Sequence, residues 1–159
     1  MNIKVGHGID IHQLKHNIPL ILAGLKIKSN LGIVGHSDGD VVIHSIVDAI
    51  LGALAKGDIG TLFPSDNPKW KNCKSTVFLK KAISIMKQDR YKILNIDINI
   101  ILEQPHLNDH ILTMRKNLSK LINIAIKNIS MKATTSDKLG FIGAQKGIMS
   151  TATILLIKN

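Results

Sequence analysis

Asp10 and His12 lie two residues apart in GHGIDIHQL, residues 6 to 14, a stretch that otherwise has the pattern of a buried strand. Side chains at positions i and i+2 of an extended chain point to the same face, so this carboxylate and this imidazole lie side by side. Such a pair is most often a surface pair, or a histidine hydrogen-bonded to its neighbour. It becomes a metal site only if the rest of the chain supplies a further ligand, because catalytic zinc takes three protein ligands.

A polar stripe on an apolar helix offers that ligand. Asp40, His44 and Asp48 recur at every fourth position of a helix predicted from Asp40 to about Lys56, whose other residues are mostly apolar. Polar groups on a buried helix need partners, because their desolvation is costly. The stripe is therefore either an internally satisfied hydrogen-bond network or part of a zinc site of Asp10, His12 and His44. In the second case Asp40 or Asp48 would orient His44.

A second polar cluster follows a strand in KATTSDKLGF, residues 132 to 141. Three hydroxyls precede a carboxylate there, in the order Thr134, Thr135, Ser136 and Asp137. Hydroxyls and turn amides at a strand end suit phosphate oxygens, and a carboxylate can hold magnesium against a diphosphate. Taken alone, the same pattern is typical of an ordinary turn.

The elements that must position these residues alternate between strands and helices. We expect one domain over residues 1–159 of the α/β or α+β class, with a mixed, mainly four-stranded sheet, helices on one face and a short hairpin. The hairpin is expected over residues 19–28, and a loop with two prolines over 57–75. The strand at 93–102 is expected to bury Leu94 with its alternating isoleucines, and the last long helix to use Ala125 on its apolar face. The remaining predicted elements are strands over 3–11, 129–134 and 148–157 and helices over 75–89 and 108–128.

Composition limits the class of partner. The formal net charge is +10, yet the lysines are scattered and only 3% of residues are aromatic, which argues against a nucleic-acid surface. Apolar runs are too short or too interrupted for a membrane span, and Cys73 is the only cysteine, which favours a reducing compartment. We expect a cytoplasmic protein, or one of a plastid-type organelle if a targeting segment has been removed. Neither nucleic acid nor membrane is expected as a partner.

Five stretches together resemble one enzyme family. They are GHGIDIH, HSDGDVVIH, GDIGTLFP, the Gln104-Pro105 pair and KATTSDKLGF, in the family's order and spacing from end to end of the chain. The family is 2-C-methyl-D-erythritol 2,4-cyclodiphosphate synthase of the non-mevalonate isoprenoid pathway. The resemblance implies a phosphorus–oxygen lyase that cyclises 4-diphosphocytidyl-2-C-methyl-D-erythritol 2-phosphate to 2-C-methyl-D-erythritol 2,4-cyclodiphosphate and releases CMP.

The resemblance also implies roles for individual residues. Asp10, His12 and His44 match the ligands of one zinc per chain, and Asp137 the position that holds Mg²⁺ or Mn²⁺ with the substrate diphosphate. His36 and Thr135 match the catalytic residues that stabilise the transition state. A homotrimer with active sites between subunits is implied as well. The implied substrate contacts are Asp10, His12, His36, Ser37, Asp58, Ile59, Gly60, Phe63, Pro64, Ser65, Asp66, Asn67, Leu102, Glu103, Gln104, Pro105, His106, Leu107, Asn108, Thr134, Thr135, Ser136, Asp137 and Phe141.

Three positions depart from the family pattern. Asp137 stands where many members have glutamate, and Ser65-Asp66-Asn67 where Asp-Thr-Asp is common. Ala144 stands where an arginine often contacts the nucleotide phosphate, and Lys146 is a candidate to compensate for the lost charge. Two other classes remain open on the residues alone. A zinc hydrolase fits the three ligands without the other motifs, and a non-enzymatic basic binding module fits the charge.

Overall fold

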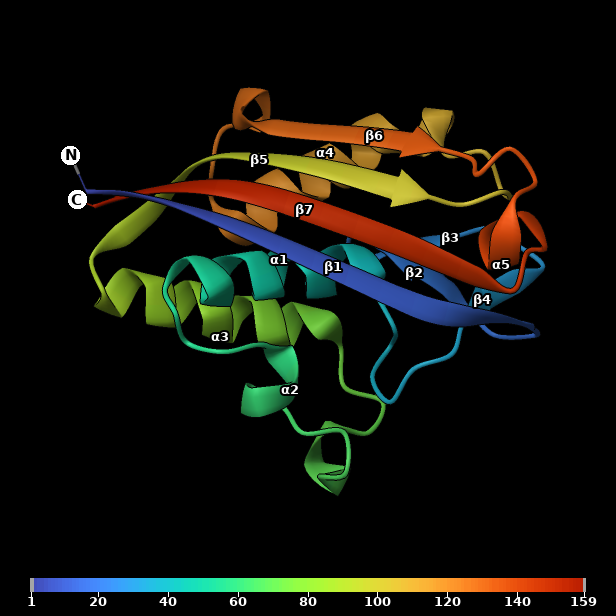
Figure 1. Ribbon diagram of the computed structural model, residues 1–159, viewed down its shortest axis with the longest axis horizontal. Coiled ribbons are helices and arrows are strands. Elements are labelled where there is room, and N and C mark those ends of the chain that lie inside the picture. Colours follow the sequence, from blue (N-terminus) through green and yellow to red (C-terminus); the bar gives the residue numbers. More distant parts are fainter. Residues whose placement is uncertain (1, 159) are drawn as a thin grey trace.

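A five-stranded mixed sheet forms the frame of the protein in a computed structural model that describes residues 2–158 (Figure 1). Its strand order is β4-β1-β7-β5-β6, with β5 and β6 parallel and the other neighbouring pairs antiparallel. The strands are β1 (Ile3–His16), β4 (Leu31–Ile33), β5 (Tyr91–Ile101), β6 (Ile129–Thr134) and β7 (Gly147–Lys158). The predicted four main strands are confirmed, and β4 is a short fifth strand that the sequence did not indicate.

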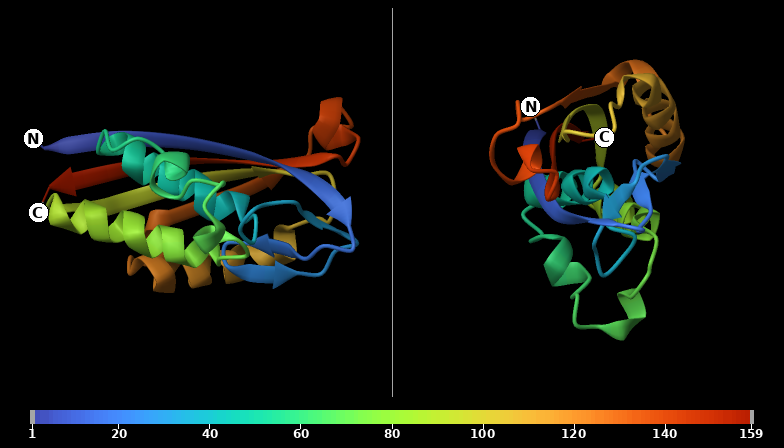
Figure 2. Two further views of the ribbon diagram at one scale, coloured as in Figure 1. Left: turned by 90° about the horizontal axis from the view of Figure 1, so that it is seen from below. Right: turned by 90° about the vertical axis from the view of Figure 1, so that its right-hand side faces the viewer.

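The three long helices lie on one side of this sheet, as predicted (Figure 2). They are α1 (Val41–Ala53), α3 (Ser75–Gln88) and α4 (Asn108–Ile122). The predicted hairpin is also present, as β2 (Leu20–Leu22) paired with β3 (Leu25–Ile27). Short elements complete the described chain: α2 (Ile59–Leu62), α5 (Gly140–Gly143) and the 3₁₀ turns Pro68–Trp70 and Ile126–Asn128. The stretch expected as a loop over residues 57–75 thus contains one of these helices and one 3₁₀ turn.

Helix α1 is buried except at Asp48 and Gly52, because it packs between the sheet and α3. This explains why apolar residues cover nearly its whole circumference, since a helix with one solvent face would show an apolar stripe only. Its N-terminus is fixed by Asp40, whose buried carboxylate accepts hydrogen bonds from the helix amides of Val42 and Ile43. The same carboxylate accepts bonds from the amides of Ala23 and Gly24 in the hairpin turn, at 3.0 and 2.6 Å. Asp40 therefore ties the hairpin to the helix that carries His44.

Two predictions of side-chain orientation are wrong. A bulge between Ile93 and Asn95 adds a residue to β5, so Ile93 is buried while Leu94 is 37% exposed. After the bulge the predicted alternation holds, and Ile96, Ile98 and Ile100 are all buried. Helix α4 ends at Ile122 because Asn123 adopts a left-handed conformation with φ of 62°, so Ala125 lies beyond the helix and is exposed.

Two glycines allow the backbone of α1 to lie directly against β1. A Cβ on Gly8 would lie 2.1 Å from the carbonyl oxygen of Ser45, and one on Gly6 would lie 1.8 Å from that of Ala49. Any larger residue would push the strand and the helix apart. Because Gly8 and Asp10 share a face of the strand, the same close approach points Asp10 at the helix. Ile9 and Ile11 point to the opposite, open face of the sheet, where they are 49% and 51% exposed.

The close approach at Gly8 predicts a selective cost of substitution. Gly8→Ala should lower the free energy of unfolding by about 1–3 kcal/mol, because overpacking must displace α1 from β1. Gly52→Ala is the matched control on the facing helix α1, since a Cβ there would meet only the carbonyl oxygen of His7, at 3.9 Å. The control should be neutral or stabilising by up to about 1 kcal/mol, as expected for alanine in a helix. Urea unfolding measures both variants, and equal stability of the two would contradict the assigned role of Gly8.

Candidate metal centre and active site

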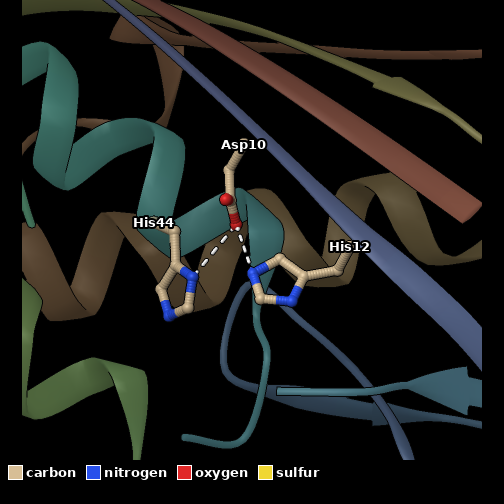
Figure 3. A group of neighbouring side chains, drawn as sticks. All are labelled: Asp10, His12 and His44. Atoms are coloured by element: carbon tan, nitrogen blue, oxygen red, sulfur yellow. Dashed lines mark hydrogen bonds and ion pairs between the residues drawn. The ribbon is translucent and has the colours of Figure 1, made fainter. Parts of the chain in front are cut away.

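Three side chains from two elements converge on the helix side of β1 (Figure 3). Asp10 and His12 come from β1, and His44 comes from the buried helix α1. One carboxylate oxygen, Oδ2 of Asp10, lies 3.1 Å from Nε2 of His12 and 3.0 Å from Nδ1 of His44. The three ligand atoms all lie within 4.8 Å of one another, so the structure brings together the three predicted zinc ligands.

The second nitrogen of each imidazole has a partner that fixes its tautomer. Nδ1 of His12 lies 2.8 Å from the carbonyl oxygen of Val34, which can only accept, so Nδ1 carries the proton. Nε2 of His44 lies 2.8 Å from the hydroxyl of Ser75, which donates its own proton to the carboxylate of Asp38. The Ser75 oxygen must then accept from Nε2 of His44. Both neutral rings consequently present a lone pair to Asp10.

Three acceptors that face one another need a cation between them. Two imidazole lone pairs and a carboxylate oxygen repel one another unless a proton or a metal ion joins them. Ligands of tetrahedral zinc at bond lengths of about 2.0–2.2 Å lie about 3.3 Å apart, close to the 3.1 and 3.0 Å that separate the nitrogens of His12 and His44 from Oδ2 of Asp10. Two histidines and one carboxylate also form a donor set that leaves one position open for a substrate oxygen. The residues present therefore fit a catalytic divalent metal.

A cleft of about 190 Å³ opens over the three ligands. Its polar residues include His36 and Ser37, as expected, and one wall is formed by Phe63, Trp70 and Phe78. Trp70 and Phe78 were not singled out from the sequence, although three of only five aromatic residues gather at this one cleft. Predicted site residues that line the cleft are Asp10, His12, His36, Ser37, His44, Ile59, Gly60, Phe63 and Ser65.

A second cleft of about 190 Å³ lies at the carboxyl ends of β5 and β6. Next to it, the carboxylate of Glu103 accepts hydrogen bonds from the amides of Ser136 and Lys138 and holds the turn after β6 in place. Asp137 lies in that turn with φ of 55°, and its amide donates to Oγ1 of Thr135. The cleft is lined by Leu102, Pro105, His106, Leu107, Asn108, Ala133, Thr134 and Thr135, all but Ala133 among the predicted substrate contacts.

The two clefts are separated by the width of the sheet. The register places Asp10 beside Ser150, Ser150 beside Ile100, and Ile100 beside Ala133. Three steps between neighbouring strands correspond to about 14 Å, at about 4.8 Å a step. The metal centre and the hydroxyl cluster around Thr135 are therefore at the same end of the sheet, but they do not form one cleft within the chain. Phe141, on α5, lines neither of the two clefts.

Comparison with known proteins identifies the family. The model of the YgbB family matches residues 3–157. The chain is 48% identical over 157 residues to the 2-C-methyl-D-erythritol 2,4-cyclodiphosphate synthase of Brachyspira hyodysenteriae, covering 99% of both chains, and 44% identical over 156 residues to that of Bacillus cereus, covering 98% and 99%. The chain belongs to the YgbB family, that of the 2-C-methyl-D-erythritol 2,4-cyclodiphosphate synthases.

Solved structures agree with this assignment. The IspF–CDP complex of Plasmodium falciparum superimposes with a TM-score of 0.88 at 42% identity, over 99% of this chain and 97% of that one. The bifunctional IspDF of Campylobacter jejuni gives a TM-score of 0.95 at 39% identity. That alignment covers 99% of this chain and 42% of the longer bifunctional one.

One predicted detail of this YgbB-family site is wrong. Asp40 and Asp48 were the residues expected to orient His44, but both carboxylates have other partners. Asp40 caps α1, and Asp48 accepts a hydrogen bond of 2.7 Å from the amide of Ile59 at the start of α2. The residues within hydrogen-bond distance of the His44 ring are instead Asp10, Ser37 and Ser75. Asp48 therefore positions the wall of the cleft, and Ser75, 31 residues along the chain from His44, holds the ring.

Electrostatics between Asp10 and the two histidines of this YgbB-family chain favour a proton on His12. The hydrogen bond to Asp10 raises the pKa of His12, although burial opposes this shift. For Asp10, burial raises the pKa, but hydrogen bonds with His12 and His44 outweigh it and hold the pKa at about 2. The carboxylate therefore stays ionised throughout the physiological range, and His12 keeps its proton to a higher pH than a free histidine.

These shifts predict that the affinity of the three side chains for a divalent metal, probed with zinc, depends on pH. Zinc must displace the proton of His12, so the apparent affinity should fall as the pH drops through the raised pKa of this residue, by up to about tenfold per pH unit for one proton. Competition with a chromophoric chelator between pH 5.5 and 8.5 measures this dependence. An affinity that stays constant below pH 6.5 would show that His12 is not a ligand. His106, which lies in the other cleft, is the control: His106→Ala should leave the pH profile unchanged.

Proposed function

We propose that the chain converts 4-diphosphocytidyl-2-C-methyl-D-erythritol 2-phosphate into 2-C-methyl-D-erythritol 2,4-cyclodiphosphate and CMP, as a metal-dependent phosphorus–oxygen lyase. The observation that carries this proposal is the convergence of Asp10, His12 and His44 beneath a cleft, in a chain of this family. In the reaction, an oxygen of the 2-phosphate attacks the β-phosphorus of the cytidine diphosphate arm. The bond from that phosphorus to the bridging oxygen breaks, and CMP leaves with the bonding electrons.

The metal that we propose at the three ligands is zinc, because two imidazoles and one carboxylate form a typical catalytic zinc set. When bound, it supplies positive charge that offsets the repulsion between the two phosphates. His36, on the wall of the same cleft, is positioned to donate to a phosphate oxygen as negative charge develops there. The aromatic wall of Phe63, Trp70 and Phe78 provides an apolar surface for the carbon skeleton.

The turn after β6 would hold the diphosphate. The Thr135 hydroxyl and the amides of the turn are the donors, and Asp137 is the proposed ligand of Mg²⁺ or Mn²⁺ bound together with the diphosphate. The cytidine would occupy the cleft between Leu102 and Asn108, next to this turn. The remaining predicted contacts, at Asp58–Gly60 and Phe63–Asn67, would bind the methylerythritol phosphate.

We also propose that the enzyme is a homotrimer with its active sites between subunits. Each chain places the two halves of the site about 14 Å apart across the sheet, so a neighbouring chain would bring a second cleft to the metal centre. The open face of β1 carries an apolar row that a subunit contact would cover: Ile3, Val5, Ile9 and Ile11, between 40% and 66% exposed. An interface of this kind buries these residues and completes the site at once.

Residues 2–158 contain no helix with both the length and the apolar character that a membrane crossing requires. We propose that the enzyme works in the cytoplasm, where its anionic substrate and the single thiol of Cys73 would be compatible with the environment. A plastid-type organelle is the alternative location for a member of this family.

The reaction itself is the decisive test of function. Purified protein with zinc and magnesium should convert the cytidylyl substrate into the cyclic diphosphate with one CMP released per product, as followed by ³¹P NMR. A linear hydrolysis product would instead support a zinc hydrolase, and no turnover together with binding to generic duplex DNA after zinc removal would support a basic binding module.

Two variants distinguish the roles of the two proposed metals. His44→Ala should lose zinc and activity, whereas Asp137→Asn should keep zinc and need at least tenfold more magnesium for its half-maximal rate.

Mixing of two inactive variants tests the site between subunits. His44→Ala and Thr135→Ala should each lose most activity, because each damages one half of every site. After unfolding and refolding together at equal amounts, about a quarter of the sites in random trimers would combine two intact halves, so about a quarter of the activity should return. No recovery, or a monomeric mass in light scattering, would place both halves in one chain. Refolding of each variant alone is the control.

A further inference from the structure

A chain of hydrogen bonds runs from the metal ligand His44 to a carboxylate outside the cleft. Nε2 of His44 lies 2.8 Å from the hydroxyl of Ser75, and that hydroxyl donates to Oδ1 of Asp38. Ser75 is the first residue of α3 and is fully buried, so solvent cannot replace its hydroxyl. Of the three residues joined by these hydrogen bonds, His44 belongs to the predicted site, whereas Ser75 and Asp38 do not.

We propose that Ser75 and Asp38 are positioning residues that fix the tautomer of His44 for metal binding. The carboxylate of Asp38 sets the direction of this series of hydrogen bonds, because a carboxylate can only accept a hydrogen bond. The hydroxyl proton of Ser75 is used for Asp38, so the Ser75 oxygen accepts the proton of Nε2 of His44. This leaves the lone pair of the ring on Nδ1, which faces Asp10 at 3.0 Å. The proposal rests on the metal site proposed above.

The carboxylate of Asp38, at the end of this series of hydrogen bonds, has a second effect. A carboxylate that polarises the donor N–H of a ligating imidazole raises the basicity of the opposite nitrogen toward a metal, a pattern common around zinc. Asp38 is itself held in place, because its Oδ2 accepts a bond of 3.1 Å from the amide of Ser75. Its own amide donates to the carbonyl oxygen of Cys73 at 3.0 Å. The loop after His36 and the start of α3 therefore form one frame behind His44.

The neighbouring Ser37 is a weaker partner for the His44 ring. Its hydroxyl lies 3.2 Å from Nε2 of His44, further than that of Ser75, and it accepts a bond from the amide of Gly39. No carboxylate bond is recorded for the hydroxyl of Ser37 in the described residues, so its proton has no fixed direction. Without Ser75, the ring could donate from either nitrogen, and part of the population would direct a proton at Asp10 instead of a lone pair.

Zinc affinity measured in solution tests the proposal without any use of substrate. Ser75→Ala removes the hydroxyl but keeps the backbone amide of residue 75, which donates to the carboxylate of Asp38. This variant should lower zinc affinity by about 10- to 100-fold. Ser45→Ala is the matched control, because Ser45 is equally buried and neighbours His44 in α1, yet its hydroxyl bonds only Val42 and Ser150. The control should bind zinc within about twofold of the parent protein. Equal affinity of both variants would overturn the proposal, whereas absence of zinc binding in the parent would overturn the proposed metal site instead.

A direct view of the tautomer gives a second, independent test. Long-range ¹H–¹⁵N correlation spectra of the metal-free parent protein, at alkaline pH where imidazoles are neutral, report which nitrogen carries the proton. We expect Nε2–H for His44 in the parent protein and in Ser45→Ala, and a mixture of tautomers in Ser75→Ala. An Nδ1–H form in the parent would overturn the proposal even if Ser75→Ala fails to fold. A purely structural role of Ser75 would leave the tautomer of His44 unchanged.

Discussion

Three hydrogen-bond acceptors held against one another constitute the constraint on which the site depends. Nε2 of His12 and Nδ1 of His44 lie 3.1 and 3.0 Å from Oδ2 of Asp10, and all three acceptors lie within 4.8 Å of one another. Such an arrangement of acceptors is stable only around a cation. The unfavourable free energy of this convergence is offset by favourable interactions elsewhere in the fold, namely a buried helix, a continuous sheet and satisfied hydrogen bonds. Among the described residues, no buried side-chain nitrogen or oxygen atom lacks a partner. The repulsion among these three acceptors is therefore what a bound cation would relieve.

The acidic residues near the centre are used to hold elements rather than to face the cleft. Asp38 binds the start of α3, Asp40 the start of α1 and the hairpin, Asp48 the start of α2, and Asp58 the hydroxyl and amide of Thr61. Asp10 is the single carboxylate among the residues that line the metal cleft. With two neutral imidazoles and a dication, the centre would carry a net positive charge. Such a cleft attracts a substrate with several phosphate charges, and the formal charge of +10 on the chain adds a favourable field.

Local patterns in the sequence predicted the main elements and the proximity of Asp10, His12 and His44, because strand and helix periods are local properties. The i, i+2 spacing of Asp10 and His12 puts both on one face of β1, and the period of the α1 stripe puts His44 on the helix, so local spacing alone indicates the three candidate ligands. The bulge at Ile93 was not predictable in this way, since the two neighbouring apolar residues Ile93 and Leu94 fit either register. The role of Ser75 was missed for another reason. Its partners Asp38 and His44 are 37 and 31 residues away, and a single serine at a helix start has an ordinary capping explanation.

The separation of the two clefts bears directly on the proposed reaction, in which each cleft would hold one set of phosphate-binding groups. Cyclisation requires two phosphates of one molecule to approach each other, so the groups that neutralise them must come from opposite sides. In one sheet, groups on β1 and β6 face the same end and remain three strands apart, a distance fixed by the hydrogen-bond ladder. Bending the sheet to join them would break the ladder, whereas a second copy of the chain can present its β6 turn to the β1 centre without any distortion. In the proposed trimer, the apolar row on the open face of β1 would give such a copy a surface on which to pack. The strand that carries Asp10 and His12 on one face would then contact a neighbouring subunit through the other.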